Sequence, residues 1–160
     1  MTSPLKTYAS WPQRLQHAGL LGLAFFACAM PILYLTKQPG GLASLWVANA
    51  VACAFLIELP RKHWWLPLCA MAIANLSAGM LFGDPLQLSL YFCLANLIES
   101  ILAAWLLQQS KLLQQFNASP QKLLKILAFA CIGPVAAGAS IGAWGLQSFG
   151  LGDYWELWML

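Results

Sequence analysis

The sequence predicts an all-α membrane protein, a polytopic transmembrane helix bundle with five full spans and the start of a sixth, organised as one domain over residues 1–160. Three observations lead to this fold class. Hydrophobic residues make up 61% of the chain and charged residues only 8%, whereas a soluble domain has about 25% charged residues. Several segments of about 18 to 24 residues are apolar on every face, as membrane spans are. The basic residues fall mainly in the short connections between these segments.

The first three spans are expected at residues 17–36, 42–59 and 64–82. The first follows the basic residues Lys6 and Arg14 and lacks a small-residue cleavage site, so we expect it to be retained and not removed as a signal peptide. The third begins after "RKHWWLP" at residues 61–67, where basic and aromatic residues together are typical of a membrane interface.

The fourth span is expected at residues 86–107 and the fifth at 123–146, joined by the polar stretch "QQSKLLQQFNASPQK". From Tyr154 the tryptophan-rich "DYWELWML" is too short for a helix that needs about 20 residues to cross a bilayer. We therefore expect the chain to be part of a longer protein, or its tail to lie in the membrane interface.

The distribution of charge predicts the orientation of the helices. Cytoplasmic loops of membrane proteins carry an excess of Lys and Arg. If every span crosses, one side holds seven of the eight basic residues and the other side holds only Lys37. Asp84 and Asp153 fall on the side of Lys37. The N-terminus is therefore predicted to be cytoplasmic, with the seven residues Lys6, Arg14, Arg61, Lys62, Lys111, Lys122 and Lys125 on its side.

Several kinds of chemistry lack support in the sequence. The five cysteines all lie in apolar segments and form no Cys-x-x-Cys pair, so neither disulfides nor a metal site is indicated. The two histidines, His17 and His63, lie near the predicted cytoplasmic ends, away from any serine in a nucleophile-like context. The segment is therefore predicted not to be an enzyme and to need no cofactor. The net charge of +3 is spread over short loops, which argues against a nucleic-acid partner.

Four polar residues inside the expected spans form the candidate site: Asn49, Asn75, Asn96 and Glu99. Counted from the predicted external ends, the three asparagines lie within about 5 Å of one another in depth, at about 1.5 Å per residue. Asn96 and Glu99 are one helical turn apart and share a face. A carboxylate at mid-membrane costs a few kcal/mol, about 2.5 to 3.5 on insertion scales, unless it is protonated or hydrogen-bonded.

Two interpretations of this polar set remain open. It can be a pocket that senses a ligand, a proton or a conformational state, with Glu99 as its charged or protonatable centre. It can equally be a set of interhelical hydrogen bonds that hold the bundle together. Small residues also predict close helix packing, at Ala70, Ala74 and Ala78 in the third span and in "GASIG" at residues 138–142.

Three segments in this order, "GLASLWVANAVACAFLI", "RKHWWLPLCAMAIANLSAGMLFGD" and "LANLIESILAAWLLQQ", resemble the first type of bacterial membrane-associated sensor domain, the MASE family. The matching elements are Leu45-Trp46, the basic and Trp-Pro-like step at 61–67, Ala74-Asn75, and Asn96 with Glu99. The likeness covers about residues 18–158. The chain departs from the family pattern at Val47 and Ala48, where a proline is frequent, and at Ser100, where alanine is usual.

The resemblance implies a module of the bacterial inner membrane that regulates a cytoplasmic output domain beyond Leu160. In this family such a domain is commonly a diguanylate cyclase, a cyclic-di-GMP phosphodiesterase or a histidine kinase. It also implies a homo-oligomer formed through the output domain, and domains that typically have about eight spans, more than are found here. The expected partners are the lipid bilayer and a small ligand of unknown identity.

Two other functions fit the same features. A vitamin-type transporter subunit that binds substrate in the membrane also has about six helices and would hold its substrate with the same polar residues. A purely structural anchor would use the Gly and Ala faces to recruit a partner. Binding of a small vitamin to the isolated chain would favour the first, and polar-site changes that affect only stability would favour the second.

Overall fold

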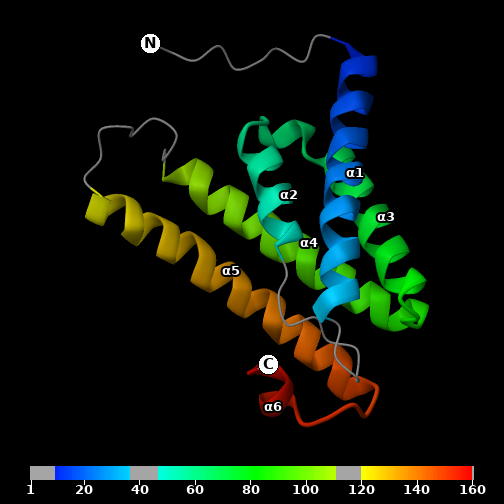
Figure 1. Ribbon diagram of the computed structural model, residues 1–160. Coiled ribbons are helices and arrows are strands. Elements are labelled where there is room, and N and C mark those ends of the chain that lie inside the picture. Colours follow the sequence, from blue (N-terminus) through cyan, green and yellow to red (C-terminus); the bar gives the residue numbers. More distant parts are fainter. Residues whose placement is uncertain (1–9, 37–46, 111–119, 160) are drawn as a thin grey trace.

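The computed structural model describes residues 10–36, 47–110 and 120–159, and within them the chain forms helices and turns without strands. Figure 1 shows the helices in chain order. They are α1 (Trp11–Thr36), α2 (Ala48–Ile57), the 3₁₀ helix η1 (Arg61–His63), α3 (Trp65–Leu81), α4 (Leu86–Gln109), α5 (Pro120–Ser148) and α6 (Tyr154–Trp158). The all-helical part of the predicted fold class is confirmed.

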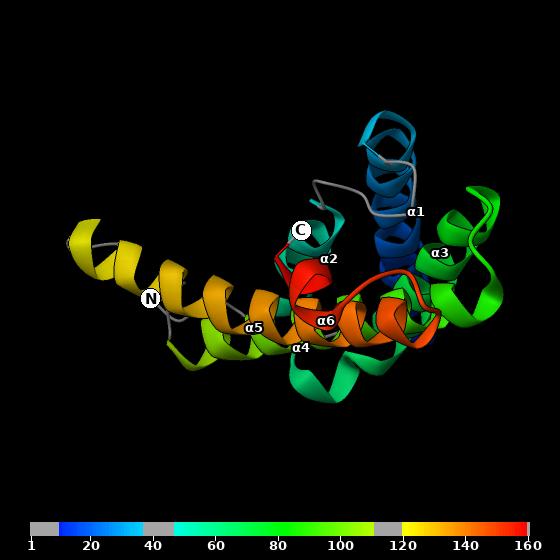
Figure 2. The ribbon, with the colours of Figure 1, turned by 90° about the horizontal axis from the view of Figure 1, so that it is seen from below.

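Two pairs of long helices organise the bundle. The α4 and α5 helices lie side by side and run in opposite directions, and α1 packs against α3. The short α2 joins the two pairs because it packs against both α1 and α4. Seen from below, α1 and α2 lie on the same side of the α4–α5 pair (Figure 2). The polar residue of α2, Asn49, is therefore placed where it can meet α4.

Apolar side chains fill the space between α1, α2 and α3. One buried cluster consists of Leu21, Phe25, Ala29, Leu33, Ala48, Ala52, Met71, Ala74 and Ala78. Small residues allow α1 and α3 to approach closely: a Cβ on Gly22 would lie 3.3 Å from the Cβ of Ala70. The alanine stripe of α3 therefore lies against α1, as small residues do at helix contacts in membranes.

Three helical segments are long and apolar enough to cross a membrane: Trp11–Leu35, Leu86–Gln109 and Ala128–Ser148. The other two expected spans are shorter. With 10 residues, α2 is about 15 Å long, half of a hydrocarbon core of about 30 Å. The 17 residues of α3 are at the lower limit for a span. Residues 42–46 of the expected second span lie outside the described residues, and five full spans are not confirmed.

The exterior of the bundle is apolar, as a bilayer environment requires. Large hydrophobic side chains are exposed on several helices, including Leu23 on α1, Ile73 on α3 and Phe129 on α5. Such extensive exposure of apolar surface is unusual for a soluble monomer. Together with the three long apolar helices, it indicates a membrane protein.

The helices alternate in direction and separate the charges. Figure 1 places the start of α1 and the α2–α3 connection at one end, and the α3–α4 and α5–α6 turns at the other. The first end carries Arg14, Arg61 and Lys62, while Asp84 and Asp153 lie in the turns at the opposite end. This separation agrees with the sidedness expected from the charges.

The residues from Tyr154 onward form the short α6, which packs on α5. The Asp153 side chain caps α6 by accepting a hydrogen bond from the backbone N–H of Trp155, with 3.0 Å between Oδ1 and N. The indole Nε1–H of Trp158 donates to Oγ of Ser140 on α5, at 3.0 Å. The tryptophan-rich segment is therefore held against the preceding helix.

Candidate functional site

The candidate site is centred on Asn49, the second residue of α2. Its side chain is buried, with 4% of its surface exposed. The Nδ2 of Asn49 donates a hydrogen bond to Oδ1 of Asn96 on α4, at 3.0 Å. The Asn49 side chain also makes a hydrogen bond with the carboxyl group of Glu99. Since an amide carries two N–H donors, one asparagine can hold both groups of α4.

Glu99 also faces α5, where glycine makes room for it. A Cβ placed on Gly138 would lie 3.0 Å from Oε2 of Glu99 and 3.4 Å from its Cβ. The carboxyl group therefore lies between the amide of α2 and the backbone of α5. Three helices meet at this one side chain, and the glycine of the "GASIG" segment permits the close approach.

Asn75 lies on α3, which packs against α1 and α4. Two close contacts show which residues of α3 and α4 lie opposite each other. Sγ of Cys93 is 3.8 Å from the carbonyl oxygen of Ala72. A Cβ on Gly79 would lie 2.9 Å from Oγ of Ser89. Asn75 falls between these points, so it is nearer than Asn96 to the turn that joins α3 and α4. The structure thus brings together three of the four candidate residues, Asn49, Asn96 and Glu99.

Some buried polar atoms of α3 and α4 lack hydrogen-bond partners within the described part of the chain. They are Nδ2 of Asn75, Oγ of Ser89 and Oγ of Ser100. Ser100 directly follows Glu99 and is 1% exposed. Each such group costs about 1 to 3 kcal/mol relative to a satisfied one. These three groups on α3 and α4 could therefore form additional hydrogen bonds.

A second polar contact, which sequence reasoning missed, joins the end of α4 to the end of α2. The Nε2 of Gln108 lies 3.3 Å from the carbonyl oxygen of Leu56, 3.2 Å from that of Ile57 and 2.9 Å from that of Leu59. The last carbonyls of a helix have no partner within it, so one glutamine satisfies several of them. We call this contact the Gln108 clamp.

Trp64 and Arg61 lie beside the Gln108 clamp and add hydrogen bonds to it. The indole Nε1–H of Trp64 donates to the carbonyls of Leu56 and Leu59, at 2.9 and 3.0 Å. Arg61 donates from Nε to Oε1 of Gln108 at 3.1 Å, and its guanidinium lies 5.7 Å from the ring centre of Trp105. The sequence signal was the polar "QQ" at the end of an apolar helix beside the basic and aromatic "RKHWW".

The site offers no set of metal ligands. No group of three His, Cys, Asp or Glu side chains in residues 10–36, 47–110 and 120–159 lies close enough to hold a metal ion. What the arrangement can do chemically is exchange hydrogen bonds, or a proton on Glu99, as α2, α4 and α5 shift relative to one another. Such a contact is compatible both with a binding or switching element and with a structural link between the helices.

Comparison with known proteins adds one finding. The family model of MASE1 matches residues 17–160 of the chain, nearly its whole length. No curated protein and no solved structure matches it.

Proposed function

This chain belongs to the MASE1 family of membrane-associated sensor domains, and from this premise we propose that it regulates a cytoplasmic output domain in cyclic-di-GMP signalling. The domain itself is sensory and not catalytic. The proposed output domain is a diguanylate cyclase or a cyclic-di-GMP phosphodiesterase. The observation that carries the proposal is the contact of Asn49 with Asn96 and Glu99, because it joins two separate helices, α2 and α4, and a shift of either helix would break it.

The contact has the properties that a switch needs. A two-state element requires two arrangements of similar energy and a ligand or proton that prefers one of them. Glu99 has its Asn49 hydrogen bond in this arrangement, while the neighbouring Ser100 hydroxyl has no partner among the described residues. If α4 rotated, Glu99 would lose its hydrogen bond to Asn49. A new hydrogen bond to the Ser100 hydroxyl in the rotated arrangement would offset part of that loss. Such a gain would reduce the difference in free energy between the two arrangements.

The α4 helix can carry such a change to the end of the bundle. Asn96 and Gln108 lie on this one helix, about 18 Å apart at about 1.5 Å per residue. A rotation of α4 that alters the Asn96 contact also moves Gln108 against the carbonyls of α2. We propose that this end faces the cytoplasm of a bacterial inner membrane, that the five expected spans all cross it, and that the module works as a homo-oligomer.

The coding sequence beyond Leu160 tests the tethered output. The proposal expects an open frame that encodes a cyclase or phosphodiesterase. A stop codon directly after Leu160 would remove that part of the proposal.

The role of the polar contact is tested in the full-length protein with Glu99→Gln, which keeps the size and removes the charge. We expect cellular cyclic-di-GMP to change by at least about fivefold, the lower range of allosteric coupling. The matched control is Glu58→Gln, because Glu58 is exposed at the end of α2. Normal output from a Glu99→Gln protein that is expressed and inserted like the control would contradict the switch.

A further inference from the structure

A hollow lies where the first turn of α1 meets the connection between α2 and α3. Its basic lining residues come from two separate elements: Arg14 and His17 from α1, and His63 from η1. Its apolar walls are Leu59, Trp65, Leu66 and Pro67. None of these residues belongs to the polar contact of Asn49, so this hollow is a separate feature of the protein.

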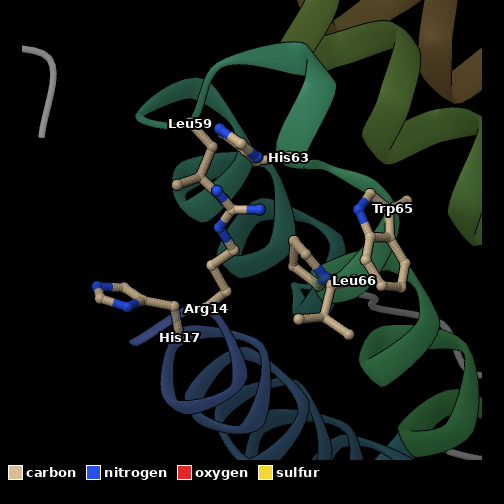
Figure 3. A pocket seen from close by; sticks show the side chains of 7 residues that line it. Arg14, His17, Leu59, His63, Trp65 and Leu66 are labelled. Atoms are coloured by element: carbon tan, nitrogen blue, oxygen red, sulfur yellow. The ribbon is translucent and has the colours of Figure 1, made fainter. Parts of the chain in front are cut away.

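The side chains differ in how they face the hollow. Figure 3 shows the Arg14 side chain rising from α1 toward Leu59 and His63, while the His17 ring is turned to the side. The Nδ1 of His17 is 2.7 Å from the carbonyl oxygen of Gln13, one turn earlier in α1. The Nε of Arg14 is buried. Arg14 and His63 are therefore the basic groups that converge on the interior of the hollow.

Positive charge accumulates around this point. Partial burial, the Arg14 guanidinium and the Lys62 ammonium together lower the pKa of His63 below its ordinary value of 6.5. Of the five carboxylate residues in the sequence, only Glu58 lies at this end of the bundle. Glu58 is exposed and does not line the hollow. The hollow therefore has the electrostatic character of an anion site.

Two exposed tryptophans lie at the hollow and are typical of residues at the depth of lipid headgroups. Trp11 and Trp65 stack with their ring centres 5.9 Å apart and their planes at 26°, and each is 51% exposed. Tryptophan is enriched at the membrane–water interface. Trp65 also lines the hollow, so the stacked pair connects the basic groups with the boundary of the bilayer.

We propose that the mouth of this hollow, whose interior of about 10 Å³ has room for about one water molecule, binds the phosphate of an anionic phospholipid headgroup. Arg14 donates to the phosphate oxygens, because a guanidinium matches the geometry of phosphate with two parallel N–H donors. His63 lies beside the phosphate, and Trp65 and Leu66 cover the less polar part of the lipid next to it. Basic pockets between transmembrane helices are a known means of binding such headgroups. The interfacial depth and the apolar walls favour a lipid over free phosphate.

The experiment measures lipid bound to the purified full chain in detergent by native mass spectrometry. Phosphatidylglycerol is added in one series and zwitterionic phosphatidylcholine in the other. We expect preferential retention of phosphatidylglycerol. Arg14→Gln should weaken it by about fivefold, the effect of one cation beside an anionic headgroup, and Arg14→Lys should restore part of the loss.

The matched control is Arg61→Gln, which removes the same charge at the same end of the bundle. Arg61 is held by Gln108 and Trp105 and does not line the hollow, so this variant should retain phosphatidylglycerol. Helical content from circular dichroism is compared for all variants to verify folding.

Three outcomes would overturn the proposal. Equal losses in Arg14→Gln and Arg61→Gln would mean a diffuse attraction to the basic end. Retention unaffected by Arg14→Gln in a folded protein would exclude the hollow. Displacement of the lipid by inorganic phosphate alone at millimolar concentration would mean a site for the free ion.

Discussion

Asn49 and Asn96 lie 47 residues apart in the sequence, and the amide of one donates to the carbonyl oxygen of the other across 3.0 Å. This hydrogen bond joins the start of a 10-residue helix to the middle of a helix long enough to span a bilayer. Because Glu99 accepts from the same asparagine, the contact is a small network centred on Asn49.

A double-mutant cycle should detect this network. Asn49→Ala and Asn96→Ala are each expected to lower the free energy of unfolding, and together by less than the sum. The coupling energy should be about 0.6 kcal/mol and at most about 1.7, the range of interhelical hydrogen bonds in membranes. Unfolding in mixed micelles with increasing denaturing detergent measures it.

Asn75 supplies the control for this cycle. It is as buried as Asn49, with 5% of its surface exposed, but its Nδ2 has no hydrogen-bond partner among the described residues. Asn75→Ala should therefore show no coupling to Asn49→Ala. A coupling as large as that between Asn49 and Asn96 would contradict the separation of Asn75 from the contact.

Gly145 on α5 should not tolerate a side chain. A Cβ there would lie 2.7 Å from both Cβ and Cγ of Tyr91 on α4. Gly145→Ala is expected to destabilise the protein by about 1 to 3 kcal/mol, as overpacking does. Gly142→Ala on the same helix meets nothing within 4 Å and should be neutral or stabilising by up to about 1 kcal/mol. Equal unfolding curves for the two variants would contradict the α4–α5 packing.

The Gln108 clamp should protect the end of α2. Gln108→Ala removes the donor to the carbonyls of Leu56, Ile57 and Leu59 and is expected to cost about 1 to 2 kcal/mol. Backbone hydrogen exchange near residues 56–64 should accelerate. The adjacent Gln109 is exposed, so Gln109→Ala should leave the exchange unchanged. Similar exchange in both variants would show that the clamp does not stabilise this segment.

His63 should titrate below pH 6.5, because partial burial, Arg14 and Lys62 lower its pKa. The folded protein then binds fewer protons at His63 than the unfolded chain does. The contribution of this group to stability is therefore present above about pH 6.5 and is lost as the pH falls toward the lowered pKa. Arg14→Gln should raise the pKa, which NMR titration of the imidazole resonance measures. An unchanged pKa would mean that Arg14 does not face His63.

Much of the fold could be predicted from local composition. Long apolar runs predicted α1, α4 and α5, and the position of basic residues predicted which helix ends share a side. The lengths of α2 and α3 were harder to predict, because an apolar residue at the end of a helix looks the same as one in the adjoining connection. Leu59, for example, is apolar and buried but lies in the turn after α2, where its carbonyl oxygen accepts from Trp64 and Gln108.

The candidate site shows the same division. Its members could be selected from the sequence because a polar residue within an apolar run is costly and needs a reason. Their partners could not, because a depth count places side chains along the membrane normal but does not say how each helix is rotated. Asn75 has nearly the depth expected for Asn49, yet its Nδ2 has no hydrogen-bond partner among the described residues, whereas Gln108 at the end of α4 contacts three carbonyl oxygens at the end of α2.

By itself, the sequence determined that this protein is a helical bundle suited to a bilayer. It also determined which polar residues lie within the apolar helices. Both follow from the transfer free energy of individual side chains. Only the tertiary structure decided that Asn49 meets Asn96 and Glu99, that Gly138 makes room for the carboxylate, and that Arg14 and His63 share a hollow. These relationships depend on helix rotation and crossing, which are set by the packing of many side chains at once and by no single segment.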